Sequence, residues 1–356
     1  MNRRTFALLT AVITFIIGVA LARLSLPNLF KTPPPVVIKQ VQLNNYRLSG
    51  PYEFEELSIF LIHGPDARDS RLYTTLQSAM ERQLVIVHET SHVNELAIEN
   101  VSTTEDVFVQ AGDIVKGGRQ DRVLSVDMIL PAKSGVVPIS AFCVEQSRWQ
   151  QRGTEAVDQF TLTEMSVNYS LRQVMKDVAT QAGVWKEVDS AHENIGAGVA
   201  GVAGSVRSVD SPTSLPLALE SEAVQESMAP YLANLSSHAY RWNDVIGFAF
   251  AINDEIKGAD VYSSNTMFIR LWPRLLKAAV VDAVAAPAMK RAPNALPIDT
   301  VGSFLVNTEL GSETVGDIPP RTQSVERSTD GGLFFETRDT AYGNAWVHRS
   351  YLPRKQ

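Results

Sequence analysis

The sequence has 356 residues, of which 45% are hydrophobic and 20% charged, so it is long enough for two average domains and apolar enough to bury a core. Its formal net charge is −7 and it has no cluster of basic residues, which excludes the pattern typical of a nucleic-acid-binding protein. A single cysteine excludes an internal disulfide and a cysteine-rich metal site.

The chain begins with Arg3 and Arg4, followed by an uncharged, mostly apolar stretch over residues 5–22. At about 1.5 Å of rise per residue, a helix over this stretch is roughly 27 Å long, close to the thickness of a bilayer core. The two arginines favour a cytoplasmic amino terminus, so we expect the rest of the chain on the far, periplasmic or extracellular side. Ala20-Leu21-Ala22 matches a signal-peptide cleavage site, so residues 1–22 are either a cleaved signal peptide or an uncleaved transmembrane anchor. If the segment is uncleaved, we expect it to attach the protein to the membrane.

Residues 23–47 contain Pro27 and the run Pro33-Pro34-Pro35, which predicts a stiff spacer. From residue 48 to about 149, short runs rich in β-branched residues alternate with Gly, Pro, Asn or Asp, which predicts an antiparallel β-sandwich-like half. The predicted strands cover residues 57–63, 84–88, 95–101, 107–110, 122–130 and 136–144.

After residue 149, helix-forming residues with apolar positions at helical spacing predict helices over 169–188, 215–235 and 267–285, with Pro273 starting or kinking the last one. Residues 246–251 and 256–262 are predicted to form a hairpin through Asn253-Asp254. We therefore expect an α+β fold, with a β-sandwich-like N-terminal half and a helical and mixed α/β C-terminal half behind the N-terminal apolar helix.

The last part of the chain, residues 286–356, is predicted to be a C-terminal extension. It is rich in proline and looks loosely structured as far as Pro320. Residues 333–336 and 345–351 are predicted to close the chain as a hairpin.

Two motifs with a known chemistry lie in predicted secondary structure that does not fit their usual function. His88 to His92 match H-E-x-x-H, which binds zinc from a helix, but the motif follows a strand-like run. On a strand the two histidines are about 13 Å apart, too far to share one ion, so no metal site is predicted. Gly196 to Gly201 match G-x-G-x-x-G but follow a helix-like stretch instead of a strand, which favours a flexible connector and no nucleotide cofactor.

A polar loop between predicted strands is the strongest candidate site. It places Lys116, Arg119 and Gln120 around Gly117-Gly118, whose backbone freedom lets the loop present these side chains together. The pattern suits an anionic ligand, and a solvated turn with arginines paired to acids is the alternative. A second polar run, Glu145 to Trp149, follows another predicted strand.

The two runs are expected to meet, either as a clasp for a negatively charged ligand with Trp149 as a stacking surface, or as an ion-pair network between the sandwich and the helices. The candidate ligand-binding residues are Lys116, Gly117, Gly118, Arg119, Gln120, Arg122, Glu145, Gln146, Arg148 and Trp149.

The chain resembles the family named the ARG and Rhodanese-Phosphatase-superfamily-associated Protein domain, over about residues 48–285. The matching segments, in order, are Asn94 to Leu96, Glu99-Asn100, Gly117 to Arg122, Pro138, Cys143 to Trp149, Gly183 to Trp185, Ser211 to Thr213, Lys257 to Asp260 and Leu271 to Leu276. The sequence departs from the family in reading Arg119-Gln120-Asp121-Arg122 instead of Lys-Gln-Asn-Arg, and in placing Ser147 before Arg148. The resemblance implies association with other domains and brings no catalytic residues.

We therefore expect an exported or membrane-tethered binding module of unestablished activity, with a small anionic ligand as candidate and no cofactor. The alternative is a hydrolase acting on a phosphate- or ribose-bearing substrate such as an ADP-ribose-like molecule, with Glu145 or Asp121 as general base and the arginines stabilising developing charge. The sequence identifies neither a protein partner nor an oligomeric state.

Overall fold

The computed structural model describes residues 38–40, 46–67, 73–146, 148–155, 159–199, 206–287 and 296–354. The predicted N-terminal apolar helix lies outside these residues, as does most of the predicted spacer. Residues 37–356 belong to one compact unit. Among the helices within the described ranges, none combines the length and the apolarity that crossing a membrane requires.

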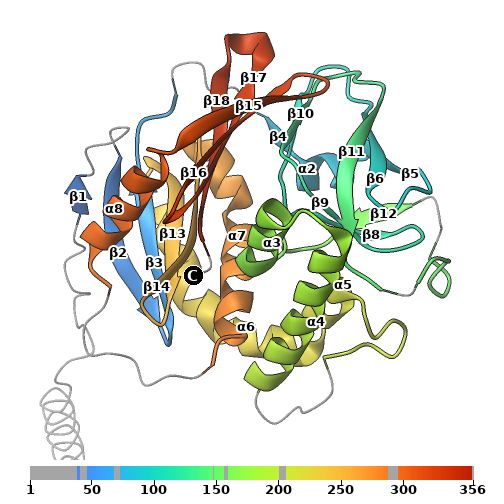
Figure 1. Cartoon of the computed structure of the whole chain (residues 1–356), viewed down its shortest axis with the longest axis horizontal. Coiled ribbons are helices and arrows are strands. Elements are labelled where there is room, and N and C mark those ends of the chain that lie inside the picture. Colours follow the sequence, from blue (N-terminus) through green and yellow to red (C-terminus); the bar gives the residue numbers. More distant parts are fainter. Residues whose placement is uncertain are drawn as a thin grey trace, which may run out of the picture. The chain divides into compact units, whose positions relative to one another are not determined.

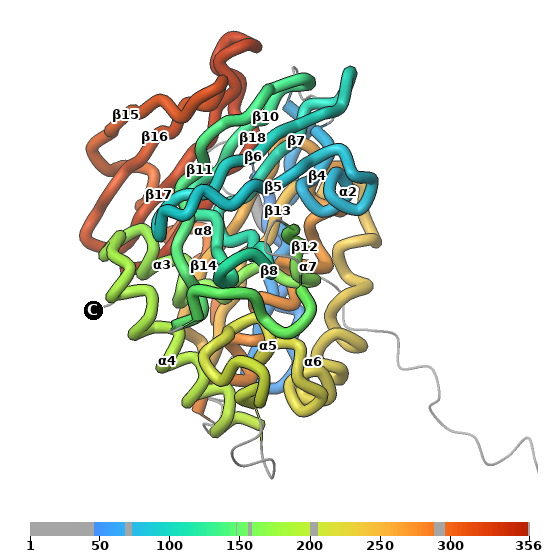
Figure 2. Tube along the Cα trace, turned by 90° about the vertical axis from the view of Figure 1, so that its right-hand side faces the viewer, coloured from blue at the N-terminus to red at the C-terminus, as the bar shows by residue number. Residues whose placement is uncertain are grey.

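Two small sheets lie at the upper right of Figure 1 and contain the strands that the sequence predicts between residues 84 and 144. The strand predicted over residues 57–63 instead belongs to the large sheet, so the predicted sandwich-like half does not begin at residue 48. The six-stranded sheet has the order β12-β8-β9-β11-β6-β5, and a three-stranded sheet has the order β10-β7-β4. In Figure 2 the antiparallel strands β5, β6 and β11 run side by side. The strands are β4 (Thr74–Thr75), β5 (Val85–Glu89), β6 (Glu95–Asn100), β7 (Val107–Val109), β8 (Ile114–Gly117), β9 (Arg122–Leu124), β10 (Met128–Leu130), β11 (Val136–Cys143) and β12 (Phe160–Leu162).

The alternation of the sequence explains how these strands bury one face. In β11, Val137, Ile139 and Ala141 are buried while the residues between them are exposed. They pack into one core with Leu96 and Ile98 of β6. The short helix α2 (Leu76–Glu81) contributes Leu76 and Ala79 to the same core.

A nine-stranded sheet forms the second layer, with the order β1-β2-β3-β13-β14-β18-β17-β16-β15. Its strands are β1 (Ile38–Gln40), β2 (Arg47–Phe54), β3 (Leu57–His63), β13 (Val245–Ile252), β14 (Glu255–Tyr262), β15 (Ser312–Ile318), β16 (Thr322–Thr329), β17 (Gly332–Asp339) and β18 (Ala345–Pro353). The central strand β13 is buried along its whole length, which fits its continuous apolar sequence. The predicted hairpin is confirmed, because β13 pairs with β14 and Asn253 and Asp254 adopt the positive φ angles of 50° and 64° that a tight hairpin turn uses.

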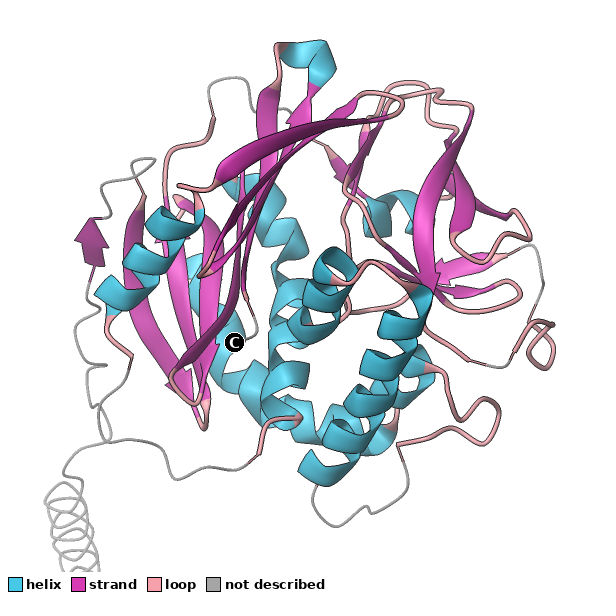
Figure 3. Cartoon of the chain, in the orientation of Figure 1, coloured by secondary structure: helices cyan, strands magenta, loops and turns pink. Residues whose placement is uncertain are grey.

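Helices cover both faces of this sheet (Figure 3). Phe248 of β13 contacts Phe268 and Trp272 of the long helix α7, while Ala249 belongs to the core on the opposite face together with Val301 of α8. Helices α4, α5 and α6 lie together at one end of the unit. The helices are α3 (Tyr169–Asp177), α4 (Gln181–Gly198), α5 (Leu215–Leu219), α6 (Glu222–Leu235), α7 (Asn265–Val284) and α8 (Ile298–Thr308), with 3-10 turns η1 (Ser236–Arg241) and η2 (Thr340–Tyr342).

Several predicted boundaries differ in the structure. The helix predicted over residues 169–188 is split into α3 and α4, because Ala179 between them has a φ of 49° that a continuous helix does not allow. Pro273 lies inside α7, which begins at Asn265. Gly196 and Gly198 belong to the end of α4 and not to a connector.

The prediction of a loosely structured segment over residues 286–320 is wrong for its second half. Helix α8 buries Val301 and Leu305 against the nine-stranded sheet, and β15 pairs with β16. Strands β17 and β18 pair as a hairpin where the sequence predicts one, and β18 also pairs with β14. Residues that the sequence assigns to an extension therefore complete the large sheet.

Candidate functional site

The loop between β8 and β9 carries the paired glycines. Gly117 and Gly118 have φ angles of 130° and 57°, which side chains rarely adopt. A Cβ atom on Gly118 would lie 2.2 Å from the ring of Phe160, and one on Gly117 would lie 2.3 Å from the carbonyl oxygen of Gln159. Both glycines are therefore required because the loop packs closely against β12.

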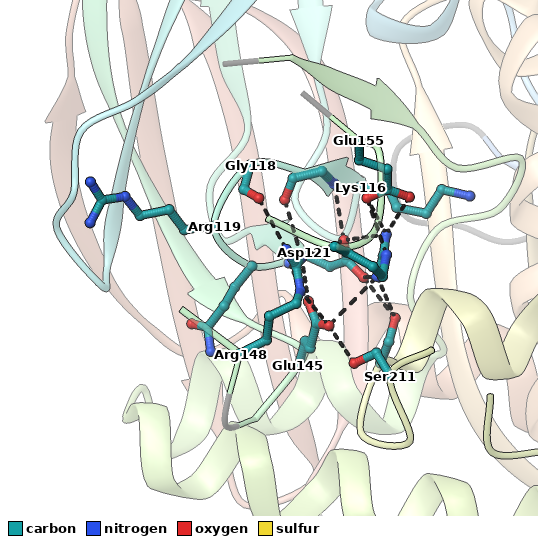
Figure 4. A network of polar contacts seen from close by, with 12 residues as sticks. Lys116, Gly118, Arg119, Asp121, Glu145, Arg148, Glu155 and Ser211 are labelled. Carbon is teal, nitrogen blue, oxygen red and sulfur yellow. Dashed lines mark hydrogen bonds and ion pairs between the residues drawn. The ribbon is translucent and has the colours of Figure 1, made fainter. Parts of the chain in front are cut away.

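The polar run after β11 folds back onto this loop and forms a buried ion cluster, which we call the loop network (Figure 4). Both Nε and Nη2 of Arg148 lie 2.6 Å from the Glu145 carboxylate, and Nη1 donates to the carbonyl of Gly118 at 3.0 Å. Arg152 pairs with Asp121 at 2.8 Å. The loop network comprises Asp121, Glu145, Arg148, Arg152, Ser211 and Ser214.

Serines from the segment before α5 complete the loop network. Ser214 donates to Asp121 at 2.7 Å, and Ser211 donates to Glu145. The carboxylates also accept backbone N–H groups, since Gly117 donates to Asp121 and the N–H of Asp121 donates to Glu145. The network thus ties the Gly-Gly loop to a segment about ninety residues further along the chain.

The charges of the loop network are buried and neutralise one another. Both carboxylates are fully buried and face two guanidinium groups. Burial, aided by the adjacent Glu145, raises the pKa of Asp121 despite its ion pair with Arg152. Burial also acts to raise the pKa of Glu145, but hydrogen bonds from Arg148 and Ser211 outweigh it and hold the pKa below its usual value.

The structure brings some of the predicted candidate residues together and separates others. Gly117, Gly118, Glu145 and Arg148 meet in the loop network. Lys116 instead pairs with Glu220 at 2.7 Å on the wall of a cavity of about 380 Å³. Gln120 is buried, and Gln146 is exposed.

Three further candidates form a surface that we call the Arg-Trp face: Arg119, Arg122 and Trp149. The Trp149 side chain is 39% exposed, and the guanidinium carbons of Arg119 and Arg122 lie 5.7 and 5.4 Å from its ring centroid. Figure 4 shows the Arg119 side chain pointing away from the loop network. Within the described ranges its guanidinium has no ion pair or hydrogen bond.

The guanidinium of Arg122 is buried and incompletely satisfied. Its Nη1 donates to the carbonyl of Gln120 at 2.9 Å, whereas Nε and Nη2 find no acceptor in the part of the chain that the structure describes. The nearest carboxylate, that of Glu89, is 3.9 Å from Nη2 and already accepts the backbone N–H groups of Ser91 and Arg119. Such unsatisfied donors are rare in protein interiors.

Neither the H-E-x-x-H motif nor the single cysteine has the geometry or the exposure of a reactive site. His88 is the fourth residue of β5, so the helical geometry that a zinc site of this pattern needs is not present there. No group of three His, Cys, Asp or Glu side chains within the described residues is arranged to hold a metal ion. Cys143 is buried, and burial raises the pKa of its thiol to about 11, which makes it a poor nucleophile at neutral pH.

The structure contains a second buried ion cluster that the sequence does not predict, which we call the His348 centre. It comprises Asp127, Arg172, Asp260 and His348. The ring nitrogens of His348 lie 2.6 Å from Asp127 and 3.0 Å from Asp260, and Arg172 pairs with Asp260 at 2.8 Å. The imidazole stacks on Tyr262 with the ring centroids 4.6 Å apart.

Charges and burial act in opposite directions on the His348 centre. Burial acts to lower the pKa of His348, but Asp127 and Asp260 outweigh it and raise the pKa to about 9. The pKa of Asp127 is held at about 2 by His348 and by hydrogen bonds from Thr337 and Ala111, against the effect of burial. The imidazole is therefore protonated at neutral pH. No local sequence pattern around His348 predicts this role.

Comparison with known proteins identifies the chain. The family model of the ARG and Rhodanese-Phosphatase-superfamily-associated Protein domain matches residues 45–352, which includes the loop network, the Arg-Trp face and the His348 centre. No curated protein and no solved structure matches the chain. The chain therefore belongs to the ARG and Rhodanese-Phosphatase-superfamily-associated Protein domain family.

Proposed function

We propose that this protein is a noncatalytic binding module that recognises an anionic ligand at the Arg-Trp face. The observation that carries the proposal is the partly exposed Arg119 guanidinium, whose donors have no partner within the described chain and which lies 5.7 Å from the centroid of the exposed Trp149 ring. The buried Arg122 guanidinium adds a positive charge 5.4 Å from the same centroid. A phosphate or carboxylate group offers the acceptors that these donors lack.

The neighbouring groups favour the same ligand class. Arg119 and Arg122 together place two positive charges next to a flat aromatic surface. A ligand that carries both an anionic group and a planar ring uses both features, through ion pairing and stacking.

We do not extend the proposal to hydrolysis by Glu145 or Asp121. Both carboxylates are fully buried and engaged by Arg148, Arg152, Ser211 and Ser214. Neither is among the residues that line the cavities of about 30, 380 and 850 Å³. A general base needs a substrate within hydrogen-bond reach.

We also propose, from the apolar segment over residues 5–22, that the module is exported and held at or released from the membrane. Amino-terminal sequencing of the protein from its producing cell separates the two outcomes. Mature protein that begins at Arg23 in a soluble fraction indicates a cleaved signal, and a Met1 terminus in the membrane fraction indicates an anchor. A Met1 terminus in the cytosolic fraction contradicts export.

The binding proposal is tested by a ligand-stabilisation screen with nucleotides, ADP-ribose and phosphosugars on the wild type, Arg119→Ala and Arg207→Ala. Arg119 is chosen because Arg148 and Arg122 are buried, so their removal also disturbs folding. We expect saturable stabilisation of the wild type by at least one anion, and binding about tenfold weaker in Arg119→Ala because a charge-assisted contact is lost. Arg207 is exposed, contacts Asp189 and the carbonyl of Pro212 instead of Trp149, and serves as the control.

Two results would count against the proposal. One is the absence of a saturable shift in the wild type across the whole panel. The other is equal affinity in Arg119→Ala and Arg207→Ala, which places binding elsewhere on the protein.

A further inference from the structure

A small cavity lies beside the His348 centre, where helix α3 meets strands β16, β17 and β18 of the nine-stranded sheet. Its volume of about 30 Å³ holds about two water molecules. Part of the wall is apolar and includes Met175, Phe335 and Leu352. The polar part of the wall consists of Asp127, Arg172, Lys176, Ser324, Thr337, His348 and Ser350.

The charges of the His348 centre neutralise one another. Asp127 faces the imidazolium of His348, and Asp260 behind the wall faces Arg172. Thr337 and the backbone of Ala111 donate the remaining hydrogen bonds to Asp127. The two acids and two bases of the centre therefore leave no net charge for a ligand.

Lys176 adds a positive charge that this centre does not balance. Its ammonium lies 4.8 Å from the centroid of the Phe335 ring, and in the described ranges no carboxylate pairs with it and no acceptor is hydrogen-bonded to it. Burial lowers the pKa of Lys176, against the attraction of Asp127 and Glu326. A half-buried ammonium without a partner is unfavourable, and an anion in the cavity relieves it.

The hydroxyl groups of the wall supply further donors. Ser350 Oγ accepts a hydrogen bond from Arg172 at 3.4 Å, so its own proton is available to another acceptor. Ser324 lines the same cavity from β16. Lys176, Ser324 and Ser350 thus present donors toward one small space whose other wall is apolar.

We propose that this cavity binds a small carboxylic acid, with the carboxylate at Lys176, Ser324 and Ser350 and its short apolar chain against Phe335, Met175 and Leu352. The size favours acetate over propionate or a sugar acid, because the space of about two water molecules takes only about four heavy atoms. The apolar wall favours a carboxylate with a hydrocarbon end over a halide ion.

The proposal is independent of the Arg-Trp face, and the experiment keeps the two apart. Thermal unfolding of the full chain is followed while sodium acetate or sodium propionate replaces sodium chloride at constant ionic strength. The variants are Lys176→Met, Ser324→Ala and Lys186→Met, the last being an exposed lysine on α4 that serves as control. Arg119→Ala is included because it alters the other face only.

We expect saturable stabilisation of the wild type, Lys186→Met and Arg119→Ala by acetate, and a weaker response to the larger propionate. Apparent affinity should fall about 10- to 100-fold in Lys176→Met and by a smaller factor in Ser324→Ala, since a charged partner contributes more than a neutral hydroxyl. The readout is a ligand-dependent shift, so a change in the intrinsic stability of Lys176→Met does not obscure it.

The proposal is overturned by any of the following results: no saturable difference between carboxylate and chloride in the wild type, an unchanged carboxylate response in Lys176→Met, or an equal loss of response in Lys186→Met. A response lost in Arg119→Ala and kept in Lys176→Met also overturns it, because it assigns the carboxylate to the Arg-Trp face.

Discussion

The loop network and the His348 centre are both buried clusters of two acids and two bases, yet they are assembled in different ways. The four charged residues of the loop network lie between positions 121 and 152, and the two serines from residues 211 and 214 close it. The His348 centre gathers residues 127, 172, 260 and 348 from an inter-strand loop, a helix and two strands. The first cluster fixes a loop, whereas the second joins the small sheets, α3 and the large sheet.

This difference predicts that the His348 centre contributes more to global stability. In Asp260→Asn, Arg172 and His348 each lose a fully buried carboxylate, and we expect the free energy of unfolding at pH 7 to fall by about 3–5 kcal/mol. Chemical denaturation measures the change. Asp189→Asn, at a half-exposed position with a partner 4.0 Å away, should stay within about 0.5 kcal/mol of the wild type. A loss below about 1 kcal/mol for Asp260→Asn contradicts the comparison.

The second prediction uses the pH dependence that the imidazolium gives to the His348 centre. The folded pKa of about 9 exceeds the ordinary value of 6.5, so this contribution is fully present below pH 6.5 and is lost as the pH rises through 9. The difference corresponds to roughly 3 kcal/mol of unfolding free energy. Denaturation between pH 6 and 10 measures it, and His348→Gln should lack this part of the decline. Equal declines in both proteins show that other groups are responsible.

The third and smallest effect concerns the loop network. Glu145→Gln keeps the shape of the side chain and one acceptor but removes the charge that Arg148 faces, so we expect a loss of about 1.5–3 kcal/mol. Glu155→Gln is the matched control, because Glu155 pairs with Arg152 at the surface and should cost little. If Glu155→Gln destabilises the protein as much as Glu145→Gln, the buried ion pairs of the loop network stabilise the protein no more than a surface ion pair does.

Residues close in the sequence explain what could be predicted. Gly117-Gly118 and the run from Glu145 to Trp149 each end a strand-like segment, so their meeting follows from local patterns, as does the turn at Asn253-Asp254. Local patterns do not indicate which arginines form ion pairs in the interior of the protein. Arg148 and Arg119 are both predicted to lie at the ends of neighbouring strands. Of the two, only Arg148 forms an ion pair with a buried carboxylate, whereas Arg119 lies beside Trp149.

Contacts between distant segments explain what could not be predicted. His348 is an isolated histidine in the sequence, and its role depends on acids 221 and 88 residues away. Helix α8 and strand β15 lie in a segment whose prolines suggest irregular structure, and they are stabilised by packing on a sheet formed mainly by other parts of the chain. Tertiary packing overrides local preference in both cases.

The pairing of β14 with β18 also sets an order for folding during synthesis. The small sheets, from Thr74 to Leu162, use only residues that leave the ribosome early, so they can form while the rest is still being made. The open edge of β14 has no partner until residues 345–353 emerge. The newly made chain therefore exposes the unpaired edge of β14 until residues 345–353 are added, and a chain that ends before His348 is expected to aggregate.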